Sequence, residues 1–160
     1  MVCNLMDSDA SPVIMNSDPE PATMRTRKPI LLVDDDTVDV MMVSRAFKEI
    51  GVNNALEVRS DGEEALDYLR HTDALPCLIL LDLNMPRMNG LEFLAEIKSD
   101  ETLKCLPVIV LSTSSEQGEI RECFKMSVAG YVVKPADYRM FLEYIKTLDS
   151  YWTMSEIAVV

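Results

Sequence analysis

Hydrophobic residues from position 29 onward fall into two alternating patterns. Short apolar runs bounded by polar residues predict five strands, at Ile30–Val33, Leu56–Val58, Cys77–Leu81, Val108–Leu111 and Tyr131–Val133. Between them, apolar residues recur every three or four positions, as on one face of a helix. These segments predict five helices, around 40–50, 62–69, 90–98, 120–124 and 141–148. Regular alternation of strands and helices predicts an α/β fold, with a doubly wound five-stranded parallel sheet covered by helices on both faces.

Local signals place several helix ends. Asp36 stands immediately before the first helical segment and is interpreted as its N-cap. Gly51 follows that segment and predicts its C-terminal stop. The stretch Ser60-Asp61-Gly62-Glu63 has capping-box spacing and predicts the start of the second helix.

Composition excludes several classes of protein. The chain has 160 residues, 48% of them hydrophobic, which suits one domain with a substantial core. Its net charge of −12 disfavours nucleic acid and membrane surfaces as partners. It has no apolar run of bilayer length and no signal-peptide pattern, and its four cysteines form no CxxC pair, so a reduced, cytoplasmic protein is expected. We expect a flexible leader over 1–28, one domain over 29–149 and an extension over 150–160.

Polar side chains follow the predicted strands, at the edge where ligands bind in open α/β sheets. The first strand ends in Asp34-Asp35-Asp36, the third in Asp82, the fourth in Ser112-Thr113 and the fifth in Lys134. Clustered carboxylates repel one another, and Mg²⁺ relieves this repulsion while accepting oxygen ligands. A lysine and a hydroxyl add contacts to phosphoryl oxygens, so the set indicates phosphoryl transfer.

Two families use such a set. Asp34-x-Asp36-x-Val38 resembles the DxDx[TV] motif of haloacid-dehalogenase-like phosphatases, in which Asp34 would be the nucleophile and Asp36 the acid/base. Ser112 or Thr113 and Lys134 would fill that family's later positions. However, no acidic residue ends a strand after Lys134, and Asp82 would have no role.

The broader resemblance is to the receiver domain of two-component response regulators. Four motifs occur in that family's order between Pro29 and Leu148. They are Leu31-Leu32-Val33-Asp34-Asp35, Ile79–Pro86 continuing to Gly90, Pro107–Ser112, and Gly130-Tyr131-Val132-Val133-Lys134-Pro135. The resemblance implies a flavodoxin-like fold with strand order 2-1-3-4-5.

The resemblance also implies a role for each matched residue. Asp82 would be the phospho-acceptor, and Mg²⁺ would bind Asp35, Asp82, the backbone carbonyl of Asn84 and, through water, Asp34. Lys134 and Ser112 would contact the phosphoryl group, Ser112 and Tyr131 would switch inward, and the Lys134–Pro135 peptide bond would be cis. The protein would be a self-phosphorylating and self-dephosphorylating signalling switch rather than an enzyme.

A narrower resemblance concerns the partners. Asp61–Arg70 and the ending from Tyr144 to Trp152 resemble the single-domain regulators of cyanobacterial and bacterial phytochromes. This likeness implies a sensor histidine kinase, a phytochrome, as phosphodonor, and a homodimer. Tyr151, Trp152 and the apolar residues after them are expected to pack on the domain or join a second chain. A binding module that works without phosphorylation is the remaining alternative.

Overall fold

Five parallel strands form one sheet in the order β2-β1-β3-β4-β5, which confirms the predicted arrangement. In this computed structural model the described residues are 28–155. The predicted leader up to residue 27 and the last five residues of the predicted extension therefore lie outside them. The strands are β1 Ile30–Val33, β2 Leu56–Arg59, β3 Leu78–Leu81, β4 Val108–Ser112 and β5 Gly130–Val133. The strand order reverses between β1 and β3, which is the point where open α/β sheets bind ligands.

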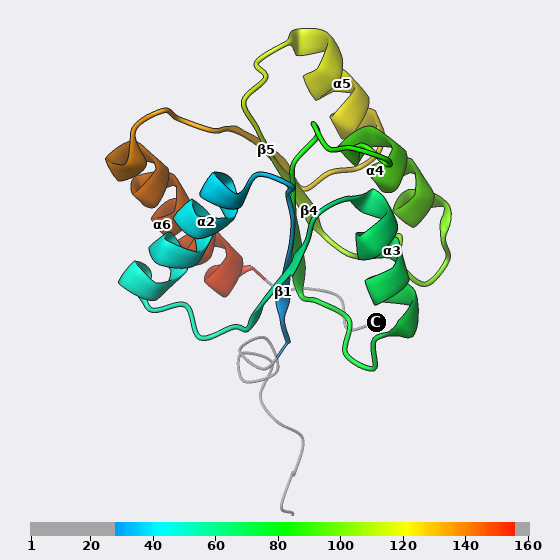
Figure 1. Cartoon of the computed structure of the whole chain (residues 1–160), viewed down its shortest axis with the longest axis horizontal. Helices are drawn as coiled ribbons and strands as arrows, with labels where there is room; N and C mark the ends of the chain where they lie inside the picture. Colours follow the sequence, from blue (N-terminus) through cyan, green and yellow to red (C-terminus); the bar gives the residue numbers. More distant parts are fainter. Residues whose placement is uncertain (1–27, 156–160) are drawn as a thin grey trace, which may run out of the picture.

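Two helical layers cover the sheet (Figure 1). The helices are α2 Thr37–Ile50, α3 Gly62–His71, α4 Gly90–Ser99, α5 Gln117–Lys125 and α6 Tyr138–Met154. On one face α2 and α6 pack on strand residues such as Leu32 and Leu80, and on the other α3, α4 and α5 pack on residues such as Leu31 and Leu81. Successive strand side chains point to opposite faces, so the fully buried β1 and β3 supply both cores.

Local sequence explains the first helix. Asp36 is extended, and its side chain accepts the Val38 backbone N–H at 2.8 Å, which confirms it as the N-cap of α2. Gly51 ends the helix with a φ of 78°, a left-handed conformation that glycine adopts without steric cost. These two residues fix where the chain leaves and rejoins the sheet.

The start of α3 differs by one residue from the predicted capping box. Asp61, not Ser60, is the N-cap, and its side chain accepts the Glu64 N–H at 2.9 Å. Ser60 donates instead to the Glu64 carboxylate through its backbone and its hydroxyl. The Asp61 side chain that caps the helix is fully buried.

The last helix crosses the predicted boundary at residue 150. Helix α6 continues without a break to Met154 because Trp152, only 9% exposed, packs in the core between α2 and the sheet. Trp152 therefore packs on the domain, one of the two expected outcomes, whereas Tyr151 is exposed and its contact with a second chain stays a prediction. Within α5, Cys123 is buried as the pattern indicated, whereas Phe124 lies on the exposed face.

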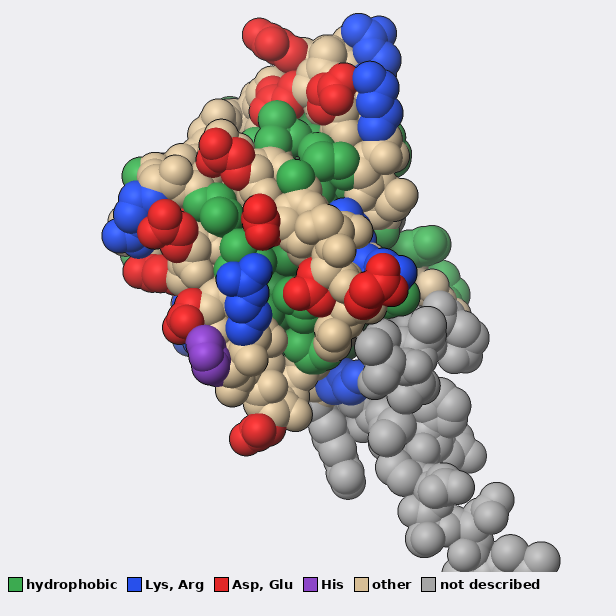
Figure 2. All heavy atoms as spheres, turned by 90° about the vertical axis from the view of Figure 1, so that its right-hand side faces the viewer, with side chains coloured by type: hydrophobic (Ala, Val, Ile, Leu, Met, Phe, Trp, Pro, Cys, Tyr) green, Lys and Arg blue, Asp and Glu red, His purple; other side chains and the backbone are tan. Residues whose placement is uncertain are grey.

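The surface over α3, α4 and α5 carries charges of both signs. Figure 2 shows acidic and basic side chains interspersed on this face, with small apolar areas between them. Several of these charges pair across elements, such as Arg70 of α3 with Glu96 of α4 at 3.7 Å. No helix in the described part of the chain has the length and apolar character needed to cross a membrane.

Candidate functional site

Three carboxylates meet at the carboxyl edge of the sheet. Asp34 and Asp35 follow β1 and Asp82 follows β3, and one oxygen from each lies within 4.8 Å of the other two. Parallel pairing of the strands produces this cluster, since the Asp82 N–H donates to the Val33 carbonyl at 2.9 Å. Asp34 and Asp82 are buried, whereas Asp35 is exposed.

The ammonium group of Lys134 forms ion pairs with two members of this cluster. Lys134 follows β5, and its Nζ lies 2.9 Å from an Asp34 oxygen and 3.3 Å from an Asp82 oxygen. Lys134 Nζ also contacts Asp39, which lies in the first turn of α2 and outside the cluster. The Asp39 oxygen is closer still, 2.6 Å from Nζ. The Lys134 side chain is only 9% exposed, so these charges interact with little screening by water.

Burial and charge shift the pKa values of the cluster. Burial raises the pKa of Asp82 to about 6, against the attraction of Lys134 and with the support of the Asp34 charge. Burial also raises the pKa of Asp34, against its hydrogen bond from Lys134. Burial alone would lower the pKa of Lys134, but the surrounding carboxylates outweigh it and raise that pKa. Three aspartates lie near one lysine here, so a further cation would offset the remaining negative charge.

The residues present fit a hard divalent cation. Asp34, Asp35 and Asp82 offer only oxygen ligands, and the exposed position of Asp35 leaves room for bound water. Asn84 lies beside the cluster, since its N–H donates to an Asp82 oxygen at 3.1 Å. An all-oxygen ligand set of this kind is typical of hard divalent cations and not of Zn²⁺, which prefers nitrogen and sulfur ligands.

The loop after β3 is fixed closely to this site. A Cβ on Gly90 would lie 2.4 Å from the Asp82 carbonyl oxygen, so only glycine fits there. Arg87, with a φ of 61°, pairs with the buried Asp61 carboxylate at the start of α3. The Gly62 N–H donates to the Met88 carbonyl at 3.1 Å. These contacts hold the loop that carries Asn84 against α3.

The predicted switch residues lie on the neighbouring strands β4 and β5. Ser112 is fully buried at the end of β4, and its hydroxyl accepts the Ser114 N–H at 3.1 Å. The half-buried Tyr131 of β5 donates its hydroxyl to the Ser114 carbonyl at 2.9 Å. Both residues therefore contact the same turn after β4.

One expectation from the resemblance is wrong. The described residues contain no cis peptide bond, so Lys134–Pro135 is trans. The Lys134 backbone N–H donates to the Ser112 carbonyl at 2.7 Å while its Nζ contacts Asp34. A trans bond, the commoner state for proline, is compatible with both contacts.

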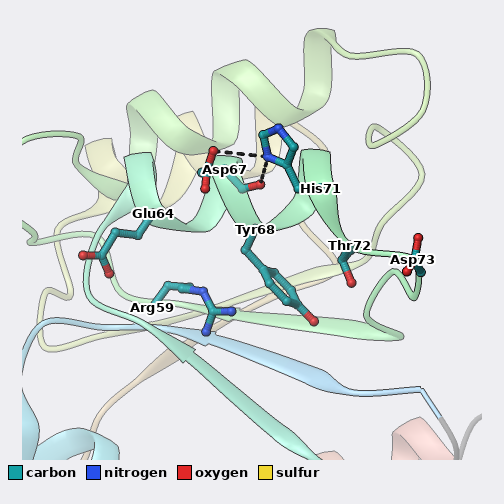
Figure 3. Close-up of a pocket in the computed structure, with 7 residues that line it drawn as sticks. All are labelled: Arg59, Glu64, Asp67, Tyr68, His71, Thr72 and Asp73. Carbon is teal, nitrogen blue, oxygen red and sulfur yellow. Dashed lines mark hydrogen bonds and ion pairs between the residues drawn. The ribbon is translucent and has the colours of Figure 1, made fainter.

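The end of β2 contributes nothing to the cluster. Figure 3 shows Arg59 lying against the ring of Tyr68, and the guanidinium carbon is 4.2 Å from the ring centroid. His71 lies near Asp67, 3.2 Å away, on the exposed side of α3. These residues line an open hollow of about 660 Å³ beside the edge strand. As the order of the strands requires, Arg59 is on the far side of β1 from Asp82.

Two features of the site were missed in the sequence. Asp39 lies in the first turn of α2, where acidic residues are common, and nothing in the local sequence indicates that it contacts Lys134. The pair of Arg87 with Asp61 joins residues 26 apart, and no local pattern signals it.

Comparison with known proteins places this site in context. Residues 30–146 match the family model described as the response regulator receiver domain. The probable methanogenesis regulatory protein FilR2 of Methanothrix harundinacea is 36% identical over 77% of this chain and 82% of its own length. Response regulator Rcp1 of Synechocystis is 33% identical over 78% of this chain and 88% of its own.

Solved structures of response regulators also resemble the structure of this chain. The phosphorylated cyanobacterial phytochrome response regulator RcpA superposes with a TM-score of 0.78 and 36% identity, covering 83% of this chain and 99% of that one. The Mn²⁺-bound form of Rcp1 superposes with a TM-score of 0.76 and 31% identity, covering 82% and 99%. Both solved structures therefore match more than four fifths of this chain.

Proposed function

The chain belongs to the response regulator receiver domain family, and from this premise we propose that Asp82 accepts a phosphoryl group from a sensor histidine kinase. Receiver domains act as signalling switches in two-component systems. The observation that carries the proposal is the position of Lys134 Nζ within 3.3 Å of both Asp34 and Asp82, at the edge where three carboxylates meet.

Each residue has a proposed role in the transfer. The Asp82 carboxylate attacks phosphorus, so a phosphorus–oxygen bond forms as the phosphorus–nitrogen bond of phosphohistidine breaks and its electron pair returns to the imidazole. Lys134 and the Ser112 hydroxyl contact the phosphoryl oxygens. We propose that Mg²⁺ is held by Asp35, Asp82, the Asn84 carbonyl and, through water, Asp34. When bound, it neutralises the charge of the carboxylates and phosphoryl oxygens.

The proposed switch uses the contacts of Ser112 and Tyr131 with the turn after β4. Phosphorylation draws the Ser112 hydroxyl away from the Ser114 N–H, and Tyr131, which donates to the Ser114 carbonyl, moves with that turn. This repacks the surface formed by α5, β5 and α6 and shifts the population of two conformations. The proposed output is a change in partner affinity, with slow self-dephosphorylation resetting the switch.

A phytochrome is the proposed kinase. The support is the likeness to RcpA, a phytochrome response regulator, over 83% of this chain. The likeness to Rcp1, whose structure contains Mn²⁺, supports the divalent site. The phosphatase alternative loses its acid/base because the Asp36 side chain caps α2.

The direct test is labelling with a small phosphodonor and Mg²⁺, followed by mass mapping. We expect one phosphate, sensitive to hydroxylamine, on the peptide that contains Asp82. Phosphate on Asp34 would favour the phosphatase mechanism. No incorporation under conditions that label a control receiver domain would favour a binding module that works without phosphorylation.

Mg²⁺ affinity should depend on pH. The pKa of Asp82 is about 6, so below pH 6 its proton competes with the cation for the carboxylate. We expect the dissociation constant for Mg²⁺, measured by calorimetry, to rise about tenfold between pH 7.5 and pH 5. A pH-independent constant over this range would contradict a role for Asp82 as ligand.

A homodimer is also proposed, through the outer face of α6. Its exposed residues Met140, Tyr144, Thr147, Tyr151 and Met154 are spaced 4, 3, 4 and 3 apart, the spacing by which two helices pack along a seam. All of these side chains except Thr147 are large, hydrophobic and exposed, which suits a second copy of the same helix.

Tyr144→Glu tests this face without disturbing the core. Tyr144 is 41% exposed, whereas deletion of the end of the helix would also remove the buried Trp152. We expect the variant to weaken dimerisation at least about tenfold in sedimentation equilibrium, because it places two carboxylates in one seam. Thr153→Glu, also on the exposed surface but off the seam, is the control. Equal dimerisation of both variants would exclude this face.

A further inference from the structure

Asp39 is the nearest anionic partner of Lys134. Its carboxylate oxygen lies 2.6 Å from Nζ, closer than those of Asp34 and Asp82. Asp39 extends from the first turn of α2, outside the group of three carboxylates that could share a cation. It contacts the site through Lys134, and its charge also repels that of Asp34.

These contacts use all the hydrogen-bonding capacity of the ammonium. Lys134 Nζ has three N–H donors, and three carboxylates lie within hydrogen-bond distance. The longest contact, at 3.3 Å, is to Asp82. A phosphoryl group on Asp82 would add anionic oxygens that need the same donors, so at least one present contact must weaken.

Asp39 is the partner that can release Lys134 most easily. Its side chain is 26% exposed, whereas that of Asp34 is 2% exposed, so water can replace the ammonium at Asp39. A cavity of about 270 Å³ adjoins both groups and is also lined by Thr113, Pro135 and Phe141. The two side chains therefore have room to separate without disturbing the core.

We propose that Asp39 is a positioning residue that holds Lys134 toward α2 in the unphosphorylated state and competes with the phosphoryl group for it. The inference rests on the proposed function and adds a determinant of how strongly this chain favours its phosphorylated state. Asp39 would also join α2 to the β5–α6 loop through Lys134, and phosphorylation would loosen that connection.

Beryllofluoride with saturating Mg²⁺ is the probe, because it mimics the phosphoryl group without turnover. Asp39→Asn removes the ion pair at nearly constant size. Asp36→Asn is the matched control, because Asp36 carries the same charge three residues earlier, makes no contact with Lys134, and asparagine preserves the helix cap. Amide chemical shifts report binding in the full chain.

We expect Asp39→Asn to tighten beryllofluoride binding at least about fivefold more than Asp36→Asn does, since a charge-assisted hydrogen bond no longer competes. With Lys134→Met in both variants, this difference should disappear. Equal effects of the two variants on a Lys134 background, or weaker binding by Asp39→Asn, would overturn the inference while leaving the proposed function intact. Failure of the unaltered protein to bind the probe would overturn both.

Discussion

Asp82→Asn is expected to abolish phosphate incorporation from a small phosphodonor while leaving the fold intact. The amide lacks the anionic oxygen that attacks phosphorus, and no other carboxylate occupies the same position relative to Lys134 and Ser112. We expect at least about a thousandfold loss of labelling, in the range typical for removal of a nucleophile. The measurement is phosphate incorporation by intact mass in the presence of Mg²⁺.

The same variant should be more stable than the unaltered protein when metal is absent. The folded pKa of Asp82 is about 6 and its ordinary value is 3.8, so its stabilising contribution is complete below pH 3.8 and is lost as pH rises through 6. At pH 7.5 the ionised carboxylate therefore costs stability. Asparagine removes this cost but weakens the contact with Lys134.

We expect a net gain of roughly 1–2 kcal/mol in the free energy of unfolding, measured with urea and a chelator at pH 7.5. Asp73→Asn, at an exposed carboxylate outside the cluster, controls for the loss of one charge. Labelling that persists in Asp82→Asn would remove Asp82 from its proposed role, and a destabilised variant would contradict the pKa argument.

Lys134→Ala is expected to have the largest effect on stability. Its ammonium is the shared partner of three carboxylates in a nearly buried position, and removal of one partner of a buried ion pair leaves uncompensated charge. We expect a loss of about 3 kcal/mol in the free energy of unfolding at pH 7.5 without metal. The loss should be smaller at pH 5, where protonation relieves the remaining repulsion.

Lys146→Ala provides the matched control, because Lys146 forms an exposed ion pair with Glu143 on α6. Water screens such a surface pair, so its loss should destabilise the protein far less than Lys134→Ala does. Lys134→Ala should still accept some phosphate, since Asp82 remains, but its amide spectrum should change far less on phosphorylation. An unchanged spectral response would exclude Lys134 as the link between phosphate and switch.

The sequence predicted the scaffold well because its signals are local and repeated. The runs Ile30–Val33 and Leu78–Leu81 are apolar without interruption, as strands buried on both faces require, and both are fully buried. Asp36 and Gly51 marked the ends of α2 through capping, which involves only neighbouring residues. The strand-end rule then placed Asp34, Asp35 and Asp82 together, as the structure does.

The parts that were missed depend on contacts between distant residues. Asp39 resembles any acid in a first helical turn, and only the fold places Lys134 beside it, 95 positions away. Phe124 fitted an apolar pattern but faces solvent, because Cys123 supplies the buried contact of α5. Trp152 extends α6 beyond the predicted boundary because the core between α2 and the sheet accommodates it.

The most direct measurement is a crystal structure of the protein with Mg²⁺ and beryllofluoride. We predict the beryllium adduct on a carboxylate oxygen of Asp82, one Mg²⁺ ligated by Asp35, Asp82 and the Asn84 carbonyl, and Lys134 Nζ in contact with fluorine. An adduct on Asp34 would contradict the account. So would a structure with no divalent ion among the carboxylates of Asp34, Asp35 and Asp82.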